Sequence, residues 1–185
     1  AGPYLLYLSR LEHPGKNHVN LIKAFELFRA QTDKEYYLVL PGPDKERAEE
    51  IHAVAEASLY ASSIKFLGFV DDQDVSDLYR GAALFVLPSF FEGFGLPVLE
   101  AMACKVPVIT SDAASLPEVS GPFTPHFDPK DPVAMKDAIV EVLADDDKRE
   151  IIAEKGLEWA QNFTWEKTVE KTLDIFRKIG KEGAK

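Results

Sequence analysis

Residues 84–103 read LFVLPSFFEGFGLPVLEAMA, and they give the clearest indication of the fold. The apolar run 84–87 has the length and composition of a strand buried on both faces. A loop with two glycines follows, and Pro97 stands near the start of a helix expected over 97–104, where its missing N–H is not needed. A strand, a loop and a helix in this order form the repeating unit of a parallel sheet covered by helices.

The rest of the chain repeats this alternation. We expect a Rossmann-like three-layer α/β/α fold with a mainly parallel sheet. The expected strands are 4–9, 36–40, 63–67, 84–87 and 106–110, and the expected helices are 17–30, 44–59, 73–80, 97–104 and 131–144. In the first helix an apolar stripe at helical spacing should face the core, formed by Leu21, Ile22, Phe25 and Phe28.

After Asp145 the alternation stops, and two helices are expected over 147–161 and 164–179 with no strand between them. Thr164 is suited to be the N-cap of the second helix. The apolar surface that these helices have to bury is formed by Ile151, Ile152, Leu157, Trp159, Phe163 and Trp165. For Trp165 and the apolar face of the second helix two outcomes are expected, packing on the domain or an exposed apolar patch. The whole chain, 1–185, is expected to form a single domain.

Composition restricts the kinds of partner. The formal net charge of −10 argues against nucleic acid, because binding to a phosphate backbone needs a basic face. An anionic small molecule can still bind where cations and backbone amides gather locally. The single cysteine, Cys104, excludes an intrachain disulfide and a multi-cysteine metal site, and it fits a cytoplasmic location. The four histidines are scattered, so no metal site is expected.

Two strand-to-helix loops carry candidate binding residues, since ligands of open parallel sheets bind at the carboxyl ends of the strands. The loop 9–16 holds Arg10 and Lys16, and two cations on one loop can neutralise a diphosphate. The alternative is a solvated loop with two surface cations.

The second loop joins the strand 84–87 to the helix that Pro97 opens. Its glycines allow the backbone to approach a ligand closely, and the amides of the first helical turn, with the helix dipole, favour an anion. Glu92 and Glu100 flank this helix end, and a carboxylate suits the vicinal hydroxyls of a sugar. The alternatives are a solvated acid for Glu92, and for Glu100 a first-turn carboxylate that stabilises the dipole.

The segment 92–100, EGFGLPVLE, preceded by Pro88-Ser89, resembles the E-x7-E motif of glycosyltransferase family 4. This family has the GT-B fold and includes sucrose, trehalose and lipopolysaccharide mannosyl- and glucosyltransferases. Further landmarks of the family are matched by LSRL at 8–11 with Lys16, FLGFV at 66–70, AMAC at 101–104, VPVI at 106–109, LPEV at 116–119 and FTWE at 163–166. The resemblance implies the C-terminal, donor-binding half of such an enzyme, without the N-terminal acceptor domain. Residues 161–185 would then be a closing helix and tail that cross towards that domain.

The resemblance also implies roles for single residues. Glu100 should bind the ribose hydroxyls of the donor, and Glu92 should hold the transferred sugar close to its anomeric carbon. Arg10 and Lys16 should neutralise the diphosphate leaving group. Backbone atoms at Val70 should face the base, and the amides that should contact sugar and phosphate are those of Phe94, Gly95, Leu96 and Val98.

The implied activity is transfer of a hexosyl group from a UDP-sugar or GDP-sugar to a saccharide or lipid-linked acceptor, with retention of anomeric configuration and without a metal. The chain alone is expected to be inactive, and the full-length enzyme to be cytoplasmic and peripheral to the inner membrane. A non-catalytic nucleotide-binding or scaffolding module of the same fold is the main alternative. A sugar-nucleotide epimerase and a retaining glycosidase that uses Glu92 and Glu100 as its acid pair are others. The anion-binding helix end favours a nucleotide donor.

Overall fold

The computed structural model describes residues 2–182, with side chains as far as Ile179. Its centre is a six-stranded parallel sheet in the order β3-β2-β1-β4-β5-β6. The strands are β1 (Tyr4–Leu6), β2 (Tyr37–Pro41), β3 (Ile64–Gly68), β4 (Leu84–Leu87), β5 (Val108–Ser111) and β6 (His126–Phe127). The expected three-layer α/β/α fold is therefore confirmed.

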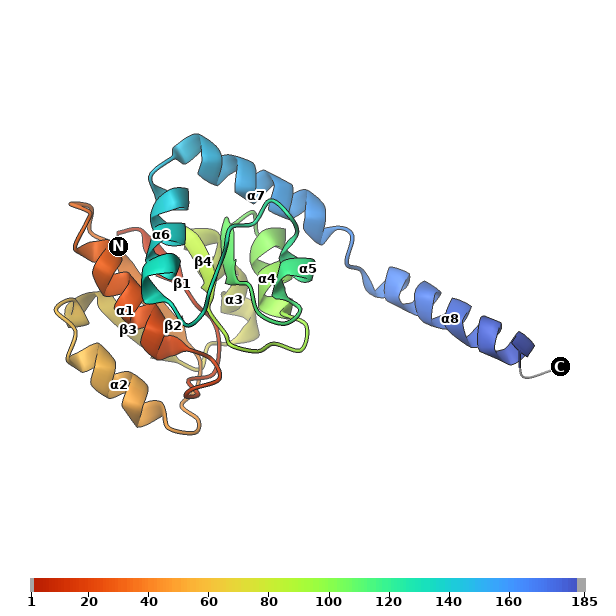
Figure 1. Cartoon of the computed structure of the whole chain (residues 1–185), viewed down its shortest axis with the longest axis horizontal. Helices are drawn as coiled ribbons and strands as arrows, with labels where there is room; N and C mark the ends of the chain where they lie inside the picture. Colours follow the sequence, from red (N-terminus) through yellow and green to blue (C-terminus); the bar gives the residue numbers. More distant parts are fainter. Residues whose placement is uncertain (1, 183–185) are drawn as a thin grey trace.

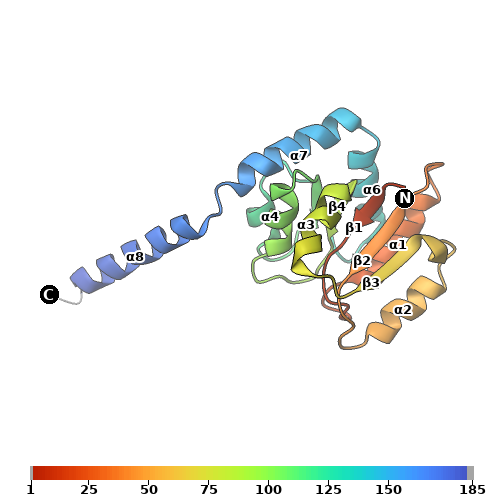
Figure 2. The same cartoon turned by 180° about the vertical axis from the view of Figure 1, so that it is seen from behind.

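Helices cover both faces of the sheet (Figures 1 and 2). The layer seen in front in Figure 1 contains α1 (His18–Arg29), α2 (Ala48–Glu56) and α6 (Pro132–Leu143), while α3 (Asp72–Gly81), α4 (Leu96–Ala103) and α7 (Asp146–Ala160) lie on the other side. Two short helices, η1 (Ala61–Ser63) and α5 (Leu116–Ser120), complete this part of the chain, and α8 (Trp165–Glu182) follows it. In the part of the chain that the structure describes, no helix combines the length and the apolar character that a membrane crossing requires.

The five expected strands and seven expected helices are all present, and the differences lie mostly at their ends. The strand expected over 106–110 begins only at Val108, because the Val106 N–H donates to the Ala101 carbonyl oxygen (3.0 Å) and Pro107 has no N–H. The helix expected over 44–59 begins at Ala48, because Arg47 has a left-handed backbone conformation with φ 58°. The prediction missed η1, α5 and β6, which are too short to show a periodicity.

The core lies between the sheet and the two helical layers. All four residues of the predicted stripe on α1 are buried, as expected, and the central strands β1, β4 and β5 are buried along almost their whole length. On α7, Ile152 is buried but Ile151 is 49% exposed, so the expectation that both pack inward was wrong for Ile151. Residues 151 and 152 differ by about 100° around the helix axis, so one stripe does not take both.

The helix α8 stands away from the α/β layers (Figures 1 and 2). Its predicted N-cap is confirmed, since the Lys167 N–H donates to Thr164 Oγ1 (3.2 Å). All its described side chains are exposed, and Trp165 is exposed by 79%, so of the two expected outcomes the structure shows the exposed patch. The apolar residues Trp165, Val169, Leu173, Phe176 and Ile179 recur at helical spacing and leave an exposed apolar face.

Lys105, two residues after the end of α4, provides a test of backbone strain far from the candidate site. It has φ 56°, a conformation that costs an L-residue about 1 kcal/mol and glycine almost nothing, and its ammonium makes only an exposed ion pair with Glu154 (3.3 Å). We expect Lys105→Gly to be about 1 kcal/mol more stable than Lys105→Ala, which loses the same ion pair but keeps the strain. Urea denaturation of the two variants measures this difference, and equal stabilities would contradict it.

Candidate functional site

A cavity of about 450 Å³ opens at the carboxyl ends of β1 and β4, between the two loops that the sequence analysis selected. Arg10 and Lys16 line it from the loop after β1, and Glu92 lines it from the loop after β4. The first residues of α4, with Gly95 and Leu96, form another wall. The fold therefore brings together two cations, a carboxylate and a helix N-terminus that are far apart in the sequence.

Lys16 and Glu92 form the central contact of this cavity. Lys16 Nζ lies 2.7 Å from Glu92 Oε1, and the two side chains are only 19% and 15% exposed. The same oxygen accepts a hydrogen bond from Ser89 Oγ (2.7 Å). Lys16 was predicted as a ligand for phosphate, and in this structure its charge is balanced by a carboxylate that was assigned to the sugar.

Buried polar contacts hold the two loops against each other. The Asn17 side-chain amide donates to the carbonyl oxygens of Pro88 and Pro129, both at 2.8 Å. The Phe90 N–H donates to the Gly15 carbonyl oxygen (3.1 Å), so the loop after β4 is tied to the loop after β1. Because Asn17 is buried, these hydrogen bonds are shielded from water and keep Lys16 and Glu92 in register.

Gly95 gives the start of α4 its shape. It is the N-cap of the helix with φ 96°, and a Cβ at this position would lie 2.8 Å from Leu116 Cδ2. Any larger residue would be both strained and too close to its neighbour. Pro97 is in the first turn, as predicted, and the Val98 N–H donates to the Gly95 carbonyl oxygen (3.0 Å). The N-terminus of α4 therefore meets the cavity through Gly95 and Leu96.

Arg10 lies at the rim of the cavity and is more exposed than Lys16. Its side chain is 55% exposed, and Nε lies 2.6 Å from Glu12 Oε2. An anionic ligand would compete with this carboxylate for the guanidinium. Because the pair is exposed, its loss is worth at most about 1 kcal/mol, and a phosphate with two acceptors can replace it.

Glu100 lies in the second turn of α4, since the first turn contains no acidic residue. The interpretation of Glu100 as a first-turn partner of the helix dipole was therefore wrong, because the helix begins at Leu96. Its Oε2 instead accepts a hydrogen bond from the Tyr79 hydroxyl (2.9 Å) on α3. Burial, and then the nearby Glu100, raise the pKa of Tyr79, so this hydroxyl remains a donor. Glu100 is exposed and does not line the cavity with Glu92.

The remaining predicted residues lie around the same edge of the sheet. Val70 is half-buried in the loop between β3 and α3, outside the cavity lining. Phe94 is 44% exposed and packs edge-on against Phe163, with 6.1 Å between the ring centroids. The Val98 side chain is fully buried, although the prediction for Val98 concerned its backbone amide.

A family model described as glycosyl transferases group 1 matches residues 2–159. The chain belongs to this family. Curated proteins are also similar to the chain over most of its length. The chain is 40% identical over 174 residues to an O-antigen chain mannosyltransferase B of Escherichia coli, covering 94% of this chain and 45% of the relative. It is 32% identical to a D-inositol 3-phosphate glycosyltransferase of Salinispora tropica, covering 95% of this chain and 38% of the relative.

Solved structures of glycosyl transferases have the same fold. A sucrose-phosphate synthase from Thermosynechococcus elongatus superposes with a TM-score of 0.85 at 26% identity, covering 98% of this chain and 46% of that one. The C-terminal domain of a group 1 family protein from Francisella tularensis superposes with a TM-score of 0.76 at 25% identity, covering 87% of this chain and 85% of that one. The chain thus spans less than half of the curated relatives described above.

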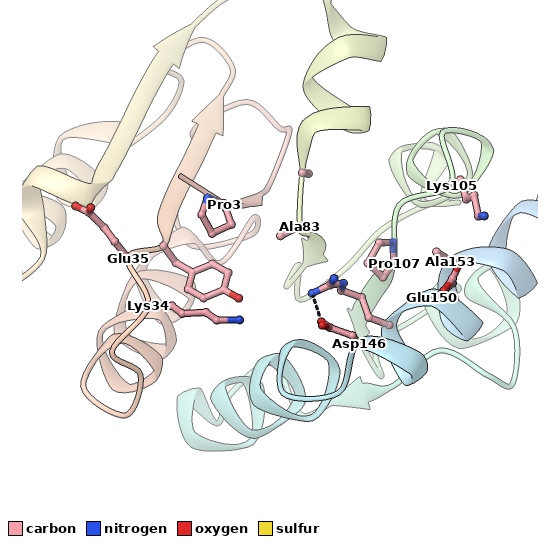
Figure 3. Close-up of a pocket in the computed structure, with 12 residues that line it drawn as sticks. Pro3, Lys34, Glu35, Ala83, Lys105, Pro107, Asp146, Glu150 and Ala153 are labelled. Carbon is pink, nitrogen blue, oxygen red and sulfur yellow. Dashed lines mark ion pairs between the residues drawn. The ribbon is translucent and has the colours of Figure 1, made fainter. Parts of the chain in front are cut away.

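In this group 1 glycosyl transferase domain a larger cavity, of about 800 Å³, lies at the opposite end of the sheet. Residues that precede strands line it, among them Pro3, Ala83 and Pro107. In Figure 3, Lys34 and Asp146 lie on facing sides, and a dashed line marks the ion pair of Asp146 with Arg149 (2.9 Å). Three cationic and three acidic side chains line this cavity, so their charges balance and favour neither an anionic nor a cationic ligand. Open parallel sheets bind their ligands at the carboxyl ends of the strands, which is the end with the smaller cavity.

The structure adds polar residues to which the sequence analysis gave no role. Ser89 and Tyr7 lie beneath Glu92, Tyr79 holds Glu100, and the Ser115 hydroxyl donates to the carbonyl oxygens of Glu92 (3.2 Å) and Phe94 (3.1 Å). The available signals were weak: Tyr7 lies within an expected strand, and Ser89 belongs to the Pro88-Ser89 pair that precedes the E-x7-E motif. Within residues 2–179, no group of three or more His, Cys, Asp or Glu side chains is arranged to hold a metal.

His18 contacts Ser9 of the smaller cavity and makes the free energy of unfolding depend on pH. Its Nε2 lies 3.2 Å from Ser9 Oγ, and burial lowers its pKa to about 3. The unfolded state, with an ordinary pKa near 6.5, therefore binds a proton that the folded state rejects between pH 6.5 and 3. We expect this residue to remove about 2 kcal/mol of the free energy of unfolding between pH 7 and pH 5.

Urea denaturation of the wild type and His18→Gln at both pH values measures the contribution of His18. The wild type should lose about 2 kcal/mol more than the variant on acidification. An equal loss in both proteins would mean that His18 binds its proton in the folded state as well.

Proposed function

We propose that this chain is the donor-binding half of a family 4 glycosyltransferase that transfers a hexosyl group from a UDP-sugar or GDP-sugar with retention of configuration. The observation that carries this proposal is the contact of Lys16 with Glu92 at 2.7 Å, in a cavity that the N-terminus of α4 also lines. A cation for phosphate, a carboxylate for hydroxyls and a helix end for an anion meet at one point. This combination matches the chemistry of a nucleotide sugar.

The cations act on the leaving group. Breaking the bond between sugar and phosphate builds negative charge on the diphosphate, and fixed donors stabilise that charge without rearranging. Lys16 and Arg10 supply the cations, and the amides of Gly95 and Leu96 with the α4 dipole supply further donors. We expect these groups to be sufficient without a metal.

The carboxylates act on the two ends of the donor. Glu92 lines the cavity and accepts from Ser89, and there it would accept hydrogen bonds from hydroxyls of the transferred sugar close to its anomeric carbon. Glu100 is exposed on α4, where its carboxylate accepts a hydrogen bond from Tyr79 of α3, and there it would bind the ribose hydroxyls. Val70, in the loop after the edge strand β3, would contact the base through its backbone. Glu100 does not line the cavity with Glu92, which argues against the two residues as the acid pair of a glycosidase.

The acceptor belongs to the part of the enzyme that this chain does not contain. Relatives are more than twice as long as the matched region, and we expect the remainder to form an N-terminal domain that binds a saccharide or lipid-linked acceptor. The exposed apolar face of α8, with Trp165, Val169 and Phe176, is suited to packing on such a domain. Without it the chain should not transfer sugar. The identity to mannosyltransferases favours a mannosyl donor and polysaccharide synthesis. We expect the full-length enzyme to be cytoplasmic and peripheral to the inner membrane.

Calorimetric titration of this chain with UDP, GDP and ADP, with and without magnesium, tests the proposal. UDP or GDP should bind with a dissociation constant from micromolar to low millimolar, about −8 to −4 kcal/mol, and magnesium should not be required. Arg10→Ala should weaken this binding, whereas Lys23→Ala, on the exposed side of α1, should not. Absence of binding by all three nucleotides would contradict the proposal. Binding without transfer in the full-length protein would favour a non-catalytic module.

A further inference from the structure

Two buried hydroxyl groups, those of Ser89 and Tyr7, form a chain of hydrogen bonds that ends at the Glu92 carboxylate. Ser89 and Tyr7 are both fully buried, and Ser89 Oγ donates to Glu92 Oε1 (2.7 Å). The Tyr7 hydroxyl lies 3.0 Å from Ser89 Oγ and 2.9 Å from the Lys16 carbonyl oxygen. The chain Tyr7–Ser89–Glu92 therefore begins at the backbone of Lys16 and ends at the carboxylate that the Lys16 ammonium contacts.

The available protons decide which group donates and which accepts in each of these hydrogen bonds. A carboxylate only accepts, so the Ser89 proton points to Glu92, and Ser89 must accept from Tyr7. The single Tyr7 proton is then shared between Ser89 Oγ and the Lys16 carbonyl oxygen. Burial, as the largest cause, raises the pKa of Tyr7, so the hydroxyl keeps this proton at any physiological pH. The orientation of the Glu92 carboxylate is thus coupled to the backbone of the loop after β1.

The two hydrogen bonds to Glu92 converge on one oxygen. Oε1 accepts from both Lys16 and Ser89, whereas Oε2 makes no hydrogen bond to any residue that the structure describes. Oε1 is therefore the anchored oxygen, and Oε2 is the one available for a hydroxyl of a ligand. This division requires that Oε1 stays anchored while a ligand is bound.

Lys16 cannot be a constant anchor if the proposed function holds, because its ammonium then turns to the diphosphate. Ser89 has no such second role, since it is buried and its backbone carbonyl is fixed by a hydrogen bond from Ser111 Oγ (2.7 Å). We propose that Ser89, oriented by Tyr7, is the positioning residue that keeps Glu92 Oε2 directed at the sugar when Lys16 binds the diphosphate. This inference rests on the proposed function for the identity of the ligand.

A crystal structure of Lys16→Met tests the anchoring without any nucleotide. Methionine fills the space of the lysine stem but removes the ammonium, as recruitment by a diphosphate would. The expected result is Glu92 in its present orientation, with Oε1 within hydrogen-bond distance of Ser89 Oγ. A carboxylate that has turned away from Ser89 would overturn the inference. The double variant Lys16→Met/Ser89→Ala should release it.

Binding selectivity gives a second test. We expect Ser89→Ala to weaken GDP-mannose or UDP-glucose about tenfold, and GDP or UDP less than twofold, because Glu92 touches only the sugar. Tyr7→Phe should do the same to a smaller extent. The control is Ser120→Ala, which removes another fully buried serine whose Oγ donates to the Leu116 carbonyl oxygen (2.7 Å), and it should change neither affinity.

The outcomes separate the two proposals. Equal losses for nucleotide and nucleotide sugar would make Ser89 a merely structural residue, and no loss for either would remove its role altogether. A wild type that binds no nucleotide would overturn the proposed function itself. The Lys16→Met structure would then still decide whether Ser89 anchors Glu92.

Discussion

Replacing Arg10 with Ala and Lys16 with Met in the same protein is expected to weaken binding of the preferred nucleoside diphosphate at least a hundredfold. Each cation offers a charge-assisted hydrogen bond to the diphosphate, worth about 1.5–3 kcal/mol, and the two lie on one loop at the edge of the cavity. Lys16 is the larger contributor, because its side chain is less exposed than that of Arg10. Isothermal titration calorimetry with UDP and GDP measures the loss.

A matched control variant changes the net charge of the protein by the same amount but leaves the cavity unaltered. The double variant Lys23→Met/Arg177→Ala takes an exposed lysine from α1 and an exposed arginine from α8, so it lowers the net charge by the same amount. This control should bind as the wild type does. If both double variants lost affinity equally, the effect would come from long-range charge, and the cavity would not hold the diphosphate.

Glu100→Ala is expected to weaken binding of the same nucleotide about tenfold or more, and to do so only when the ligand carries ribose hydroxyls. A carboxylate that accepts two hydroxyl groups is worth about 1.5–3 kcal/mol, and Tyr79 already fixes one of its oxygens (2.9 Å). Glu100→Gln, which can still accept from Tyr79, should lose less. The measurement is a titration of each variant with the diphosphate and with its 2′,3′-dideoxy form.

The two forms of the ligand complete a double-mutant cycle between protein and nucleotide. The dideoxy ligand should bind the wild type as weakly as the ribonucleotide binds Glu100→Ala. It should lose nothing further in the variant. An equal additional loss with the dideoxy ligand would show that Glu100 acts through the fold of α4 and not through the ribose.

The fold could be predicted from the sequence because its signals are local and repeated. Runs such as 84–87 and 106–109 are short, apolar and bounded by loops. The apolar stripe of α1, from Leu21 to Phe28, repeats with the spacing of an α-helix. The errors came where tertiary contacts decide the outcome. The two-residue strand β6 exists because it pairs with β5, and the start of α2 at Ala48 depends on the left-handed conformation of Arg47.

The candidate site was predicted in part, for a similar reason. Arg10, Lys16 and Glu92 stand in loops at the carboxyl ends of strands, and the topology brings exactly such loops together. The contact between Lys16 and Glu92 could not be predicted, because it depends on the buried Asn17 side chain, which donates to backbone carbonyl oxygens 71 and 112 residues away. Tyr79 beside Glu100 comes from another helix, and no local pattern indicates that pairing.

We expect the nucleotide to bind at the carboxyl ends of β1 and β4, and an amide NMR titration of this chain with UDP and GDP tests this location. Saturable shifts are expected at Arg10, Lys16, Gly95 and Leu96, which line the smaller cavity. Shifts confined to Lys34, Lys105 and Arg149 would instead place the ligand in the larger cavity at the opposite end of the sheet, and the proposed donor site would be wrong.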